Sequence, residues 1–332
     1  MHMVDCIVFV ALAEERDSFF EVFHENSQLR PLTGLIARFF NYIAPGEKTA
    51  LGVVIDLPRQ GDVTAAMITE RALSQITAKT AVSIGISGAL TEDVHVGDIV
   101  VPTNVWEYSY RSKALEREDI LSDEFDILFA GQEYPTSESV RSTLKEIVNF
   151  QSELIADLGE TSNQNFVHEL GTEKVNALKK SGILGDALQV HVGGTIVAGP
   201  VLGASNKFKD LLLHKNRLLL ALDMESSGVA SAVLSRADPP ELIVIRGISD
   251  NADHRKKALE KTTRGLARHI SLLSSARLLQ TLLAKTEVRE NDRRSVGQHK
   301  SGEIQPGSES NPPKLRNDKF LTRFLRHGFV GF

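Results

Sequence analysis

Residues 243–253 read IVIRGISDNAD, an apolar run that becomes polar within a few positions. The first half is typical of a buried strand, because strands covered on both faces are continuously apolar. The second half places charged and hydroxyl side chains at the end of that strand, namely Arg246, Ser249, Asp250 and Asp253. Ligands of open α/β sheets bind beyond the carboxyl ends of the strands. We therefore interpret this stretch as one part of a ligand site.

Strand-like and helix-like segments alternate along most of the chain, which predicts an α/β domain with a parallel or mixed central sheet. Strands are expected at 4–12, 80–90, 97–108, 190–199, 218–224 and 241–248, and an antiparallel pair at 35–44 and 49–57 around the turn PGEK. Helices are expected at 14–25, 61–76, 206–215, 225–237 and 262–285. The polar stretch 111–186 follows neither period and is interpreted as insertion-like.

The composition argues against several classes of protein. The chain has 332 residues, 42% of them hydrophobic, and a formal net charge of −5. A concentrated basic excess is missing, so we expect no nucleic-acid partner. The single cysteine, Cys6, excludes a disulfide framework and favours a reducing, cytoplasmic location. No apolar run reaches the roughly 18–20 residues of a membrane span, and the N-terminus does not resemble a signal peptide.

Three more predicted strands end in groups suited to a small ligand. The first ends in ALAEE, with Glu15 opening the next helix, and another ends in LDMESSG, with Met224 and Glu225 at a strand-to-helix junction. The third ends in GISGAL, which we interpret as a small-residue turn holding Ser87 and Gly88. Glycine allows a ligand to approach the backbone closely. Together with the opening stretch, these segments predict one polar rim along the sheet.

Four stretches together resemble a known family: ALAEE, SIGISGAL followed by VHVGDIVVP, ALDMESSGVA and VIRGISDNAD. They are similar to the nucleoside phosphorylase/nucleosidase family, and most like its methylthioadenosine/S-adenosylhomocysteine nucleosidase branch. The resemblance covers residues 4–285 in matching order. It implies a single three-layer α/β domain with a twisted mixed central sheet, neither metal nor organic cofactor, and a homo-oligomer that acts on a small nucleoside or nucleotide.

The resemblance also implies roles for individual residues. Glu15 matches the glutamate that positions the attacking water, and Glu225, after Met224, matches the glutamate that holds the ribose hydroxyls. Asp250 matches the aspartate that protonates N7 of the leaving purine, and Ser249 the serine that orients it. We also expect Ser87, Gly88 and Arg246 to contribute to substrate binding.

Two positions depart from the pattern of that branch. Ile86 replaces a polar residue often found in the glycine-rich segment. Leu202 falls where an aromatic residue often stacks on the base, and we take it as a substrate-binding position.

The expected reaction is hydrolysis of the N-glycosidic bond of an adenine nucleoside or a related nucleotide. This bond breaks through an oxocarbenium-like cation, so it needs an acid at the leaving base, a carboxylate near the sugar and a base that directs water to C1′. Asp250 donates a proton near neutral pH only if its surroundings favour the neutral acid. Burial and the nearby carboxylates Asp253 and Glu225 are expected to do this.

Two other functions stay open. A phosphorolytic enzyme of the same family needs cations for phosphate, but Ser83 stands where related phosphorylases carry an arginine, and Arg59 alone is a weak substitute. The other function is a nucleoside-binding signalling or effector module without catalysis. The set of Glu15, Glu225 and Asp250 argues against it, because binding alone does not require a group that directs water.

The last part of the chain has a different composition. Residues 286–319 are rich in charge, Ser, Pro and Gly and contain no aromatic residue, which predicts a disordered linker after a catalytic domain at 1–285. Residues 320–332 form a short basic and aromatic segment.

Overall fold

The computed structural model describes residues 2–26, 32–116, 125–150, 152–201 and 203–285. All of them belong to one compact unit. The expected linker at 286–319 and the segment at 320–332 lie outside the described residues. Within those residues twelve strands form one mixed sheet, as the sequence predicts. No helix of the described part is long and apolar enough to cross a membrane.

The long strand β5 (Ile76–Ala89) lies at the centre of the sheet. It pairs in parallel with β1 (His2–Val10) on one side and with β14 (Glu241–Asp250) on the other. The short strand β13 (Leu219–Asp223) runs antiparallel to the end of β5, with Leu222 opposite Gly88. This arrangement brings the last residues of β5, β13 and β14 to one place in the sheet.

The outer strands extend the sheet in both directions. Beyond β1 lie β4 (Lys48–Asp56), β3 (Ile36–Ala44) and β2 (His24–Asn26), and the antiparallel pairing of β3 with β4 confirms the predicted pair. The predicted strand 97–108 is two strands, β6 (Ile99–Val101) and β7 (Asn104–Glu107). The predicted strand 190–199 is likewise divided, into β11 (Val190–Val192) and β12 (Thr195–Ala198).

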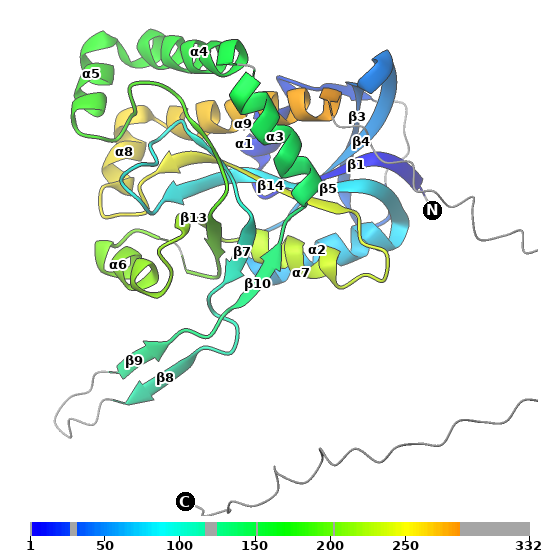
Figure 1. The fold of residues 1–332 in the computed structure, drawn as a ribbon, viewed down its shortest axis with the longest axis horizontal. Helices are drawn as coiled ribbons and strands as arrows, with labels where there is room; N and C mark the ends of the chain where they lie inside the picture. The colour runs from blue at the N-terminus through cyan, green and yellow to red at the C-terminus, as the bar shows by residue number, and fades with distance from the viewer. Residues whose placement is uncertain (1, 27–31, 117–124, 151, 202, 286–332) are drawn as a thin grey trace, which may run out of the picture. The chain divides into compact units, whose positions relative to one another are not determined.

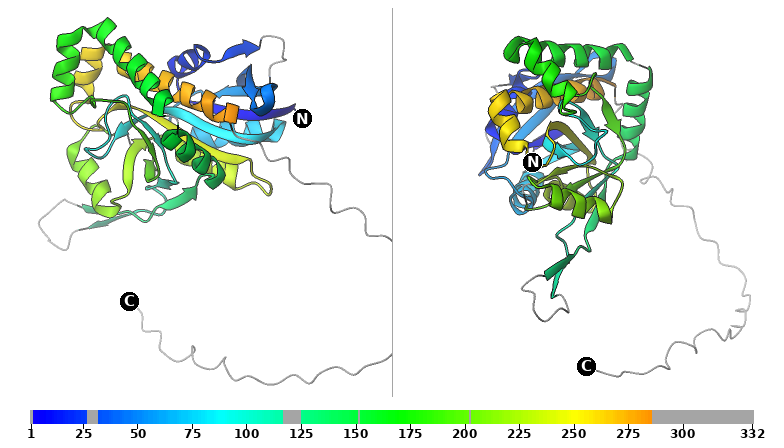
Figure 2. Two further views of the ribbon diagram at one scale, coloured as in Figure 1. Left: turned by 45° about the horizontal axis from the view of Figure 1, so that its top comes forward. Right: turned by 90° about the vertical axis from the view of Figure 1, so that its left-hand side faces the viewer.

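Helices cover both faces of the sheet and complete the three expected layers (Figures 1 and 2). On one face α9 (Leu266–Lys285) packs with α1 (Ala13–Phe20), and on the other α2 (Asp62–Gln75) packs with α7 (Ser226–Leu234). Successive side chains of a strand point to opposite faces. Accordingly, Ile7 and Phe9 of β1 belong to the same core cluster as α2 and α7, while Cys6 and Val8 join the cluster of α9.

The stretch that the sequence left unassigned contains regular structure. The strands β8 (Lys113–Glu116) and β9 (Phe125–Leu128) pair as a two-stranded sheet that projects from the rest of the unit in Figure 1, and β10 (Gln132–Pro135) joins the main sheet beside β7. Three helices follow, α3 (Glu138–Phe150), α4 (Ser152–Leu170) and α5 (Thr172–Lys180).

Helix α6 (Asn206–Lys215) forms as expected, and α9 forms most of the helix predicted at 262–285. The sequence did not predict the separate helix that precedes α9. Helix α8 (Lys256–Thr263) ends where Arg264 and Gly265 take φ values of +53° and +84°, and α9 begins at Leu266. Left-handed residues commonly end a helix. This break turns α8 back across the carboxyl ends of the strands.

The contact between α2 and α7 depends on Gly228. A Cβ at this position would overlap the carbonyl oxygen of Asp62. We expect Gly228→Ala to lower the free energy of unfolding by about 1–3 kcal/mol, because a well-packed helix contact does not accept an added methyl group. Urea unfolding followed by circular dichroism measures the change.

Gly159→Ala in α4 is the matched control. A Cβ at Gly159 would meet Leu188 at an ordinary 3.4 Å, so this change should be neutral or stabilising. Equal destabilisation by the two substitutions would contradict the close α2–α7 contact.

Candidate active site

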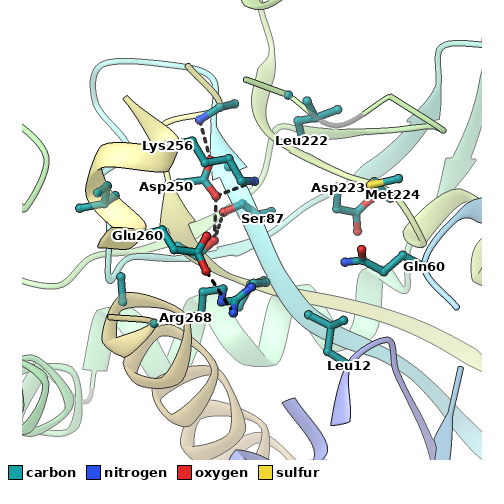
Figure 3. A pocket seen from close by; sticks show the side chains of 18 of the residues that line it. Leu12, Gln60, Ser87, Leu222, Asp223, Met224, Asp250, Lys256, Glu260 and Arg268 are labelled. Atoms are coloured by element: carbon teal, nitrogen blue, oxygen red, sulfur yellow. Dashed lines mark hydrogen bonds and ion pairs between the residues drawn. The ribbon is translucent and has the colours of Figure 1, made fainter. Parts of the chain in front are cut away.

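A pocket of about 970 Å³, part of it open to solvent, lies at the carboxyl ends of β5, β13 and β14. Helix α8 and the start of α9 complete its wall, as Figure 3 shows. Six of the residues predicted from the sequence line it: Ser87, Gly88, Met224, Glu225, Ser249 and Asp250. The ends of three of the four predicted strands therefore meet at one pocket, whereas Glu15 is not among its lining residues. Leu202 lies outside the described residues.

Glu15 is held by the backbone beside this pocket. Its Oε2 accepts hydrogen bonds from the N–H groups of Ala11 and Leu12, each at 3.0 Å, and its Oε1 accepts one from Ile86 at 3.0 Å. The side chain is buried, and burial raises the pKa of Glu15, although the charge of Arg246 and the three N–H donors oppose the shift. Glu15 also lines an adjacent hollow that shares Gly265 and Arg268 with the main pocket.

Glu225 stands at the junction of β13 and α7, as the LDMESSG stretch predicts. Its Oε1 accepts a hydrogen bond of 3.1 Å from the N–H of Gly61. Burial, together with the nearby charges of Asp223 and Glu15, raises the pKa of Glu225 to about 7, although Arg246 and the Gly61 N–H favour the charged form. Glu225 and Glu15 are therefore close enough for the charge of one to affect the other.

Arg246 is the buried cation beside these carboxylates. Its Nε donates to Asp223 at 2.5 Å and its Nη2 donates to the hydroxyl of Ser83 at 2.8 Å. Ser226 also donates its hydroxyl to Asp223. Arg246 is 2% exposed and is not part of the pocket wall, so its guanidinium lies behind the pocket and not on its surface.

Asp250 ends β14 at an irregularity of the sheet. The register with β5 shifts between Ile248 and Asp250, which leaves Ser249 as an extra residue, and such bulges redirect side chains. Asp250 Oδ2 accepts from the Ser249 hydroxyl at 3.0 Å, and Oδ1 accepts from the N–H of Ala252 at 2.9 Å. A Cβ on Gly88 would come within 2.8 Å of the same carboxylate, so glycine is needed opposite it.

The charged neighbour of Asp250 differs from the expectation. The sequence predicts carboxylates, but the ion pair that Asp250 makes is with Lys256 of α8, whose Nζ lies 3.0 Å from Oδ2. Asp253 is turned to Arg255, at 2.7 Å, and Glu225 to the Gly61 backbone. The reason is the position of α8, which places a lysine at the end of β14.

Several lining residues have no counterpart in the sequence prediction. They are Gln60, Asp223, Lys256, Glu260 and Arg268. Arg268 joins two acidic side chains, with Nη2 at 3.0 Å from Glu14 and 3.2 Å from Glu260. The segment GISGAL also differs from its prediction, because Gly85, Ser87 and Gly88 belong to β5 and not to a turn. Pairing with β14, on both sides of the bulge at Ser249, keeps this segment extended.

Among the described residues, no group of three or more His, Cys, Asp or Glu side chains is arranged to hold a metal ion.

The family model of the phosphorylase superfamily matches residues 14–284. The chain therefore belongs to the phosphorylase superfamily, as the resemblance of its four stretches predicts. No curated protein matches the chain significantly.

Solved structures share the fold at low sequence identity. A 5′-methylthioadenosine/S-adenosylhomocysteine nucleosidase from Helicobacter pylori, in a structure with butyl-thio-DADMe-Immucillin-A, aligns with a TM-score of 0.57 and 19% identity over 85% of this chain and 98% of that one. Futalosine hydrolase of Helicobacter pylori aligns with a TM-score of 0.56 and 20% identity over 84% and 97%. An S-adenosylhomocysteine nucleosidase from Streptococcus pyogenes aligns with a TM-score of 0.56 and 16% identity over 85% and 97%. These likenesses establish a nucleoside phosphorylase-like fold.

The raised pKa of Glu225 predicts how stability depends on pH. An unfolded glutamate titrates near pH 4.3, and the folded Glu225 at about 7, so the folded state binds more protons between these values. The free energy of unfolding should therefore fall as pH rises through this window, by up to roughly 3 kcal/mol from this residue. Urea unfolding between pH 4.5 and 7.5 measures the slope.

Glu225→Gln should flatten this slope and leave the part that Glu15, whose pKa is also raised, contributes with the same sign. The exposed Glu153 of α4 offers a matched control, since Glu153→Gln should leave the slope unchanged. A wild-type stability that rises across the window would contradict the raised pKa.

Proposed function

We propose that this chain is a purine nucleosidase, which hydrolyses the N-glycosidic bond of a purine nucleoside or a related nucleotide. The observation that carries the proposal is the pair of buried carboxyl groups, Glu15 and Glu225, whose pKa values are raised and which lie beside a pocket that also contains Asp250. Perturbed carboxyl groups in one cleft are typical of acid–base catalysis.

Glu15 is assigned to the attacking water. Its three backbone hydrogen bonds fix the carboxylate in one orientation, and its burial favours proton uptake. As the water oxygen forms a bond to C1′, Glu15 accepts a proton from it. A positioned general base of this kind contributes roughly 10²–10⁴-fold to the rate.

Glu225 is assigned to the ribose and Asp250 to the purine, on the two sides of the glycosidic bond that breaks. The Glu225 carboxylate accepts hydrogen bonds from the ribose hydroxyls and stabilises the positive charge that develops on the sugar. When the bond from C1′ to N9 breaks, its electron pair moves into the purine, and N7 takes up a proton. The protonated form of Asp250 is assigned to that step, and the carboxylate that remains after the transfer pairs with Lys256. Arg246 acts as a positioning residue that balances the charges behind the pocket.

Hydrolysis is supported over phosphorolysis by the cations of the pocket. Of the described residues that line it, Lys256 and Arg268 are cationic, and both are paired with carboxylates. Arg59, the alternative phosphate-binding cation, is exposed and is not among the lining residues. These carboxylates balance both positive charges, so the described lining residues leave no uncompensated charge to attract a phosphate dianion. The catalytic carboxyl groups likewise favour an enzyme over a binding module.

We expect Asp250→Asn to reduce turnover of a purine nucleoside by roughly 10²-fold or more, because an amide does not give up a proton to N7. The loss should be much smaller for a nitrophenyl riboside, whose leaving group departs without protonation. Steady-state kinetics on both substrates measures the difference.

Glu225→Gln is the control, since Glu225 acts on the sugar and its loss should impair both substrates alike. If Asp250→Asn impairs the nitrophenyl riboside as strongly as the purine nucleoside, Asp250 is not the group that protonates the base.

A further inference from the structure

Lys256 has no step of its own in the proposed reaction, in which it is only the ion-pair partner of Asp250. It is the first residue of α8, six positions after Asp250, and its partly buried side chain lines the pocket (Figure 3). Its Nζ lies 3.0 Å from Asp250 Oδ2. The next residue, Lys257, is exposed and does not line the pocket. The ammonium of Lys256 is therefore directed to the end of the pocket that holds Asp250.

The Asp250 carboxylate has little capacity to accept further hydrogen bonds. Oδ2 already accepts from Ser249 and Lys256, and Oδ1 already accepts from the Ala252 N–H. The Ser249 hydroxyl, which lies next to it, is also 3.3 Å from the carbonyl oxygen of Ser87. An amino group on the purine would need a free acceptor here. Beside Asp250 on the pocket wall, the Lys256 ammonium instead offers donors.

The inference rests on the proposed function, in which Asp250 faces N7 of the base. The C6 substituent of a purine lies next to N7 on the same edge of the ring. A cation within hydrogen-bonding distance of the Asp250 carboxylate is therefore close to the C6 substituent. An ammonium has three donors and no acceptor. It can bind a carbonyl oxygen, whereas an amino group at C6 presents hydrogens to it.

We propose that Lys256 selects nucleosides whose purine carries a carbonyl oxygen at C6. This differs from the adenine nucleoside expected from the sequence. As the bond from C1′ to N9 breaks, the electron pair spreads over the ring of a 6-oxopurine and onto its C6 oxygen. Lys256 donates a hydrogen bond to that oxygen and stabilises the developing charge, while N7 takes up its proton. Lys256 keeps its own protons throughout.

The test compares kcat/KM for inosine and adenosine, which differ in the C6 substituent. In the wild type, kcat/KM should be at least about tenfold higher for inosine than for adenosine. A site that hydrogen-bonds a polar substituent rejects an analogue that leaves the donor of the protein unpaired. Lys256→Met, which keeps the length of the side chain without its charge, should lower kcat/KM for inosine about tenfold more than kcat/KM for adenosine, so that the preference of the wild type is lost. Lys257→Met should leave both values unchanged, and circular dichroism checks that both variants fold.

A binding measurement separates this inference from the proposed hydrolysis. Formycin B and formycin A are nucleoside analogues with an oxo and an amino group at the position equivalent to C6, and their C–C glycosidic bond is not hydrolysed. Titration calorimetry should show tighter binding of formycin B to the wild type, and loss of that preference in Lys256→Met. This result without any turnover of nucleosides would support the role of Lys256 and contradict the hydrolase.

Three results would overturn the role of Lys256. One is a wild-type protein that prefers adenosine to inosine, or formycin A to formycin B. A wild-type protein that does not distinguish the two members of either pair would count equally. Another is a Lys256→Met variant that impairs inosine and adenosine equally, which would make Lys256 only a partner that orients Asp250. The third is a loss confined to inosine 5′-monophosphate and adenosine 5′-monophosphate, which would assign the cation to a 5′-phosphate.

Discussion

The buried ion pair between Arg246 and Asp223 is the interaction on which the site depends. It connects the end of β13 to β14, and the bond from Arg246 to Ser83 adds β5, so one guanidinium joins three strands. A buried charge is costly unless it is paired and hydrogen-bonded. Removing one partner of such a pair typically costs about 3–5 kcal/mol, because the other charge is left alone in a medium of low polarity.

The same guanidinium makes it possible to bury Glu15 and Glu225 close together. Its charge opposes the increase in their pKa values, which burial and mutual repulsion cause. Without a cation, both carboxyl groups would be driven further toward the neutral form. With it, the increase in both pKa values is opposed, which suits the roles proposed for them as a base and a sugar-binding carboxylate. The arrangement lowers stability at neutral pH, a cost that is common where catalytic groups are held away from water.

Local sequence patterns were enough to locate the carboxylates. Glu15, Glu225 and Asp250 each follow an apolar strand, and the rule for open sheets places such positions at one edge. The amphipathic spacing of Val140, Leu144 and Ile147 in α3 was missed, because the surrounding polar stretch obscured it.

Other features depend on contacts between distant segments. The small residues of GISGAL resemble a turn, and only the pairing with β14 makes them a strand. Lys256 gains its position from the left-handed Arg264 and Gly265, which separate α8 from α9. Neither periodicity nor composition indicates that a lysine six residues after Asp250 turns back to pair with it. The choice of base is accordingly the property for which the sequence was least informative.

The origin of the oxygen that attaches to C1′ tests the account most directly. We expect inosine, incubated with the protein in ¹⁸O-labelled water without phosphate, to yield hypoxanthine and ribose with one labelled oxygen at C1. Added phosphate should neither accelerate the reaction nor produce ribose 1-phosphate, and Glu15→Gln should abolish the labelled product. Strict dependence on phosphate, with unlabelled ribose 1-phosphate as the product, would contradict water attack directed by Glu15.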